Sequence, residues 1–130
     1  MISKTTNGVL IQVRTQYVPE ESNPQNQYFF FAYTISIKNL NGGPVQLLNR
    51  HWIITDGHGK IEEVRGPGVV GQQPCLNPND SFEYTSYCPL RTPTGSMRGS
   101  YQMSHENNDK FDVEIPEFEL IKPGAMGPLH

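Results

Sequence analysis

Apolar and polar residues alternate one by one through much of this chain, and no segment shows the three-to-four-residue spacing of an amphipathic helix. The alternation is strongest from Gln27 to Asn39. Successive side chains of a β-strand point to opposite faces, so this spacing predicts strands with one face in a core. The residues on the apolar side of this segment are Phe29, Phe31, Tyr33, Ile35 and Ile37.

Further alternating segments are separated by clusters of Gly, Pro, Asn and Asp, which predict turns. Pro116 shifts the alternation by one residue, which predicts a β-bulge or a bend at a sheet edge. About seven short strands predict an all-β, antiparallel β-sandwich of the fibronectin type III or immunoglobulin-like kind, with a compact barrel as the alternative. The predicted strands cover residues 9–18, 27–39, 45–56, 61–64, 81–88, 97–103 and 111–120.

A length of 130 residues fits a single domain spanning 1–130, and the first and last segments, 1–7 and 123–130, are predicted to be flexible ends. The formal net charge of -3 disfavours nucleic-acid binding. The N-terminus lacks the apolar core of a secretory signal, and no stretch is long and apolar enough for a membrane span, which together predict a cytoplasmic protein. Cys75 and Cys88 are predicted to be reduced thiols, with Cys88 on a strand.

The segment from Arg65 to Gly71 spells G-x-G-x-x-G, a motif known from nucleotide-binding loops. A dinucleotide site needs a helix after the motif, but Pro74 and the lack of helical spacing exclude one here. Two interpretations remain. The glycines form a tight or bulged crossing between the sheets, which we favour, or the loop amides bind phosphate, pyrophosphate or a nucleotide. The candidate anion-binding residues are Arg65, Gly66, Gly68, Val69, Val70 and Gly71.

Aromatic side chains lie on both sides of the strand predicted at 27–39. Tyr28 and Phe30 fall opposite the apolar side, where an ordinary sandwich faces solvent. Exposed aromatic residues are typical of binding interfaces. Either the polar loop at 19–26 covers the two rings, or Tyr28 and Phe30 form an interface with a protein partner or a second copy of the chain.

Neither a metal site nor a catalytic centre is predicted. The candidate metal ligands have no helical or zinc-finger spacing; they are His51, Asp56, His58, His105 and Glu106. The pairs Cys88 with His105 and Ser86 with His51 can be assembled, but no nucleophile motif accompanies them. We therefore predict no cofactor, and an enzymatic activity is not expected.

Five segments in this order resemble the ApaG family, whose stand-alone members are bacterial, and the match covers nearly the whole chain. They are residues 52–56, 65–74, 82–86, 92–103 and 111–116. The resemblance implies a fibronectin type III-like sandwich, a link to cobalt and magnesium resistance or efflux, and eukaryotic relatives in which the domain is fused to an F-box protein or to a DNA-polymerase-interacting protein. One departure is Asn79, where the family usually has glycine; asparagine tolerates the left-handed backbone, so the turn is expected to survive.

The resemblance and the aromatic excess favour a non-enzymatic protein-protein interaction module whose link to metal tolerance is indirect. A metal exporter would need membrane spans, and none is present in the sequence. The alternative function is a sensor of phosphate, pyrophosphate or a nucleotide that uses the glycine-rich loop at 65–71.

Overall fold

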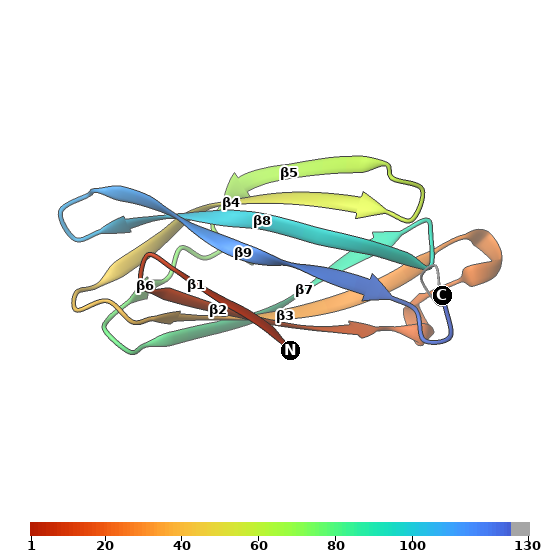
Figure 1. Cartoon of the computed structure of the whole chain (residues 1–130), viewed down its shortest axis with the longest axis horizontal. Helices are drawn as coiled ribbons and strands as arrows, with labels where there is room; N and C mark the ends of the chain where they lie inside the picture. Colours follow the sequence, from red (N-terminus) through yellow and green to blue (C-terminus); the bar gives the residue numbers. More distant parts are fainter. Residues whose placement is uncertain (126–130) are drawn as a thin grey trace.

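Two antiparallel β-sheets lie face to face in the computed structural model, which describes residues 1–125 (Figure 1). The first sheet has the strand order β1-β2-β3-β7. Its alternating apolar residues point toward the second sheet, so the predicted all-β antiparallel sandwich is confirmed. The strands of the first sheet are β1 (Ile2–Thr6), β2 (Val9–Tyr17), β3 (Phe29–Asn39) and β7 (Ser81–Leu90).

The second sheet has the order β5-β4-β8-β9, with the short β6 paired to β4. β9 also contacts β1 and β2 of the first sheet, which closes one side of the sandwich. Short 3-10 turns, η1 (Pro19–Glu21) and η2 (Pro24–Asn26), lie in the loop before β3. The strands of the second sheet are β4 (Val45–Asp56), β5 (Ile61–Pro67), β6 (Cys75–Leu76), β8 (Thr94–His105) and β9 (Lys110–Ile121).

The described residues form nine strands rather than about seven, because the residues of β1 and β6 do not show the alternation of a half-buried strand. β1 lies within the segment 1–7 that was expected to be flexible, and it pairs with β2 from Ile2 to Thr6. Its side chains are mostly exposed, so main-chain hydrogen bonds rather than a buried face hold it in place. At the other end, residues 126–130 of the predicted flexible segment 123–130 lie outside the described residues.

The core follows the alternation seen in the sequence. Every second residue of β3 is buried along its whole length. Trp52 of β4 contacts Tyr33 from the first sheet and Phe118 from β9, with ring centroids 5.4 and 5.9 Å apart. The buried hydroxyls of Tyr84 and Tyr101 pair with each other across the core, 2.5 Å apart.

The sequence also predicts local features at two prolines and one asparagine. The register between β8 and β9 shifts between Met97 and Gly99, opposite the segment containing Pro116, and confirms the predicted bulge. The strand predicted at 81–88 is longer than expected, because β7 continues through Pro89 to Leu90. β7 is the outermost strand of its sheet, and a proline can lie there with its nitrogen turned away from the neighbouring strand. Asn79 has a φ of 70°, so the turn survives without the family's glycine, as predicted.

The part of the chain from 1 to 125 contains no helix that is both long and apolar enough to cross a membrane.

Candidate binding surfaces

The glycine-rich segment forms the end of β5 and a tight hairpin beyond it. β5 extends to Pro67, and Val69 and Gln72 then exchange main-chain hydrogen bonds of 2.8 and 2.9 Å around Val70 and Gly71. Gly68 has a φ of +64°, and a Cβ atom there would lie 2.3 Å from the carbonyl oxygen of Gln72. These glycines therefore have the conformational use that was favoured, but in a hairpin beside the second sheet rather than in a crossing between the sheets, because β5 and β6 both pair with β4.

Main-chain groups of this loop are already engaged within the protein. The Gly68 amide donates to the Leu48 carbonyl at 2.8 Å, and the Val69 amide donates to Gln72. From the core side, the Arg50 guanidinium donates to the carbonyls of Pro67 and Gly68 at 2.8 and 3.0 Å. Two of the main-chain amides that were proposed to bind an anion thus already donate hydrogen bonds to carbonyl oxygens of the protein. The anion-binding hypothesis itself stays a prediction.

Arg65 points instead to the outer face of the second sheet. Its Nη2 lies 3.4 Å from Oε1 of Glu63, which also contacts Nε2 of His51 at 2.7 Å. The hydrogen bond from His51, followed by the charge of Arg65, lowers the pKa of Glu63. Arg65 and Gly66 line a groove of about 490 Å³ whose floor includes Ser100. Arg65 thus shares this groove with Gly66, and its joint action with the amides of the loop stays a prediction.

Val70 is strained at the tip of this hairpin. Its φ is 43° and that of Gly71 is 78°, the positive values that a two-residue type I′ turn requires. A β-branched residue is costly in this region, whereas Asn-Gly is a preferred pair. Because Val70 is 53% exposed, its replacement removes little packing.

We expect Val70→Asn to raise the free energy of unfolding by about 1 kcal/mol, or the melting temperature by about 4 °C. Thermal unfolding followed by circular dichroism measures the change. Val70→Ala serves as the control, since alanine removes the branched side chain but does not favour the left-handed region. A Val70→Asn protein that melts at or below the wild-type temperature would contradict the strain at this turn.

Three aromatic side chains meet on the outer face of the first sheet; we call Tyr28, Phe30 and Tyr87 the aromatic group. The Phe30 ring stacks on Tyr87 with centroids 5.4 Å apart, and Tyr28 lies 6.2 Å from Phe30. Tyr87 is 58% exposed and Tyr28 is 37% exposed, while Phe30 between them is half-buried. The structure thus places Tyr28 and Phe30 together, as predicted, and adds Tyr87 from β7.

The polar loop before β3 borders the aromatic group without covering it. The Ser22 hydroxyl accepts a hydrogen bond from the Phe30 amide at 2.9 Å, and the Val18 amide donates to the Phe30 carbonyl. These contacts hold the main chain of Phe30, yet Tyr87 keeps more than half of its surface exposed. The aromatic group is available for contact with another molecule, and its use as an interface stays a prediction.

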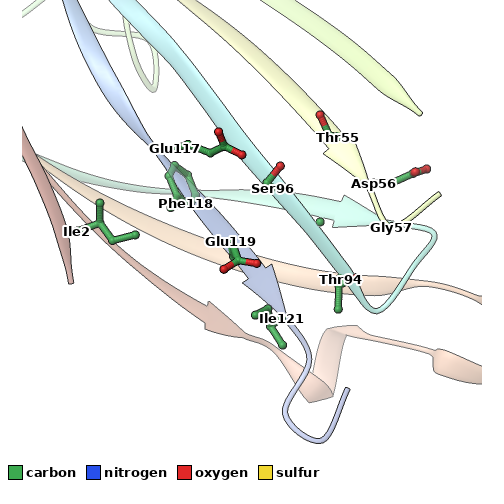
Figure 2. A pocket seen from close by; sticks show the side chains of 11 residues that line it. Ile2, Thr55, Asp56, Gly57, Thr94, Ser96, Glu117, Phe118, Glu119 and Ile121 are labelled. Carbon is green, nitrogen blue, oxygen red and sulfur yellow. The ribbon is translucent and has the colours of Figure 1, made fainter. Parts of the chain in front are cut away.

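A second hollow, of about 510 Å³, lies where β4, β8 and β9 approach their ends (Figure 2). Glu117 and Glu119 of β9 stand beside it, together with Ser96 of β8. The carboxylate of Asp56 accepts hydrogen bonds from the amides of His58 and Lys60, at 2.9 and 3.0 Å. Asp56 therefore stabilises its own turn, and no residue of either predicted site lines this pocket.

The candidate metal ligands do not come together. Glu63 contacts His51, Asp56 caps its turn, and the His105 ring stacks on Phe111 with centroids 4.2 Å apart. Within residues 1–125, no three His, Cys, Asp or Glu side chains form a group that could hold a metal ion.

The Cys88 thiol is buried on β7, as predicted for a structural cysteine. Burial raises the pKa of Cys88 to about 11, which disfavours the thiolate that nucleophilic chemistry requires. His105 lies on β8 of the second sheet, where it pairs with Val45 of β4, whereas Cys88 lies on the first sheet. The pair of Cys88 with His105 is therefore not supported by the fold.

Comparison with known proteins identifies close relatives over nearly the whole chain. Residues 19–105 match the family model described as the ApaG domain. A protein named ApaG from Dechloromonas aromatica is 53% identical over 123 residues, which cover 93% of this chain and 97% of the relative. Another from Bdellovibrio bacteriovorus is 55% identical over 116 residues, covering 89% and 91%. The crystal structure of a Bordetella pertussis protein described as ApaA has a TM-score of 0.86 and 51% identity, with 93% of this chain and 95% of that chain covered.

Proposed function

The chain belongs to the ApaG domain family, and from that premise we propose that it is a non-enzymatic protein-binding module that contacts its partner through the aromatic group. The family resemblance found in the sequence is thereby confirmed. The observation that carries the proposal is the stacking of Phe30 on the largely exposed Tyr87, on a sheet face turned away from the core.

The chemistry of this surface suits protein contacts. Tyrosine and phenylalanine rings present large apolar areas at a small cost in conformational entropy, and they are enriched among residues that dominate binding energies. Four residues before Tyr87 on β7, Glu83 forms an exposed ion pair of 3.5 Å with Arg14 of β2, so charged groups lie farther along the same sheet. An apolar centre with a charged rim is the usual anatomy of a protein interface. In this proposal the protein acts in the cytoplasm, and the link to cobalt and magnesium tolerance is indirect, through the partner.

Replacing the exposed ring tests the proposal. We expect Tyr87→Ser to weaken partner binding about thirtyfold, since the loss of a central aromatic contact costs roughly 2 kcal/mol. Tagged wild-type protein and variants, used as bait in extracts of the native cell, would recover the partner, whose affinity is then measured with purified components. Phe30→Ser is the second variant, and circular dichroism confirms that each remains folded.

Ile61→Ser is the matched control, because Ile61 is 60% exposed on β5 of the other sheet. It should recover the partner as well as the wild type does. Equal recovery by wild type, Tyr87→Ser and Phe30→Ser would show that the aromatic group is not the interface.

A further inference from the structure

The outer strands of the two sheets differ in how their free edges are protected. On β1, Lys4 forms a 2.9 Å ion pair with Glu114 of β9, so these edges lie together on the closed side of the sandwich. β9 also carries a bulge. β5 has three charged residues within seven positions, namely Glu62, Glu63 and Arg65. Charges, prolines and bulges are among the devices that prevent an edge from pairing with another chain.

β7 has no bulge, and its one charge and its one proline lie toward its two ends. It is ten residues long, and Glu83 near its beginning is its only charged residue. Among the described residues it pairs with β3 alone, without a shift in register. The segment from Tyr84 to Cys88 is free of charge and proline. A long and regular edge with an uncharged central segment is a template for another strand.

The direction of the free main-chain groups follows from the pairing with β3. The Asn39 amide donates to the carbonyl of Asp80 at 3.0 Å, just before β7 begins. Hydrogen-bonded positions recur at every second residue of an antiparallel ladder, so even-numbered residues of β7 bond to β3 and odd-numbered residues face outward. Pro89, which has no amide hydrogen, falls on the outward set. Thr85 and Tyr87 therefore present their main-chain groups to the free edge.

We propose that β7 pairs antiparallel with β7 of a second copy of this chain, about a two-fold axis at Tyr87. The inference rests on the proposed function, because it names the partner of the aromatic group. Tyr87 exchanges main-chain hydrogen bonds with Tyr87 of the second copy, and the Thr85 amide donates to the Pro89 carbonyl across the axis. The first sheet then continues from one molecule into the other.

Charge complementarity selects the second copy and fixes the register. With Tyr87 on the axis, Glu83 of one molecule, which contacts Arg14 of its own sheet at 3.5 Å, also lies opposite Arg91 of the other molecule, and the symmetry produces this pair twice. Arg91 is exposed and forms no ion pair with any residue from 1 to 125. The same register brings both Tyr87 rings, each stacked on a Phe30, to the axis. One pairing thus supplies hydrogen bonds to the free edge of β7, places opposite charges near each other at its two ends, and brings the exposed rings together.

Charge exchange tests the pairing and its register. Sedimentation equilibrium is expected to give a concentration-dependent dimer for the wild type. Glu83→Arg, or Arg91→Glu, places like charges opposite each other twice per dimer, and each should raise the dimer Kd about tenfold. The double variant Glu83→Arg/Arg91→Glu restores the attraction and should return the Kd to near the wild-type value. Tyr87→Lys, which sets two lysines on the axis, should abolish the dimer.

Glu119→Arg on the exposed face of β9 makes the same charge change on the other sheet and should leave the dimer unaffected. A wild type that stays monomeric at about 1 mM, far above a useful Kd, overturns the inference. A double variant whose dimer Kd is no lower than that of the single variants overturns it as well. If Tyr87→Ser loses a different protein while Glu83→Arg retains it, the second copy is the wrong partner but the proposed function stands. If neither a dimer nor a Tyr87-dependent partner is found, both fail.

Discussion

Trp52→Ala is expected to lower the free energy of unfolding by about 3–5 kcal/mol, a large share of the stability of a domain of this size. Trp52 is 3% exposed and lies between the sheets. Its ring meets Phe118 at 90° and Tyr33 at 64°, the edge-to-face arrangements that aromatic pairs prefer. Removing the indole leaves a cavity lined from both sheets, which cannot collapse without moving one sheet against the other.

Urea unfolding followed by circular dichroism measures this loss, since Trp52 is the only tryptophan and its fluorescence disappears with it. Ile53→Ala is the matched control on the same strand, because the next residue of β4 points to the outer face. A loss for Trp52→Ala no greater than that for Ile53→Ala would contradict the position of Trp52 at the centre of the core.

The sequence predicts the strands whose two faces have different surroundings. β3 is the clearest case, because one face lies in the core and each apolar position is buried. β1 was not predicted, because neither of its faces is buried and its sequence therefore does not alternate between apolar and polar residues. A local signal was nevertheless present: Asn7 and Gly8 have φ values of 50° and 77°, as a type I′ hairpin requires, and Asn-Gly is a preferred pair for it.

The candidate site shows the same division between local and long-range information. Phe30 could be assigned to the outer face from its place in the alternation alone. Tyr87 could not be joined to it, because that contact depends on the register between β3 and β7, which are separated in sequence by β4, β5 and β6. The Gly68 amide likewise finds its acceptor on Leu48, a residue distant in sequence, so the motif could not show that the amide was occupied.

Gly99 of β8 is a glycine with a structural requirement of another kind, close approach rather than a positive φ. A Cβ atom at Gly99 would lie 2.0 Å from the carbonyl oxygen of His51 and 3.2 Å from the Cα atom of Trp52. Both are main-chain atoms, so relief of the clash requires β8 to move away from β4. The irregularity in the β8–β9 register, between Met97 and Gly99, lies in the same segment of β8.

Gly99→Ala is therefore expected to cost about 3 kcal/mol in the free energy of unfolding, at the upper end for an overpacked site. Gly43→Ala is the control, since a Cβ atom there meets nothing within 4 Å, and its effect should stay within about 0.5 kcal/mol. Equal stability of the two variants would contradict the close approach of β4 and β8. Because the strain falls on the second sheet, a folded Gly99→Ala protein should still bind through the aromatic group on the first sheet. Its affinity would then separate the contribution of that surface from the stability of the sandwich that carries it.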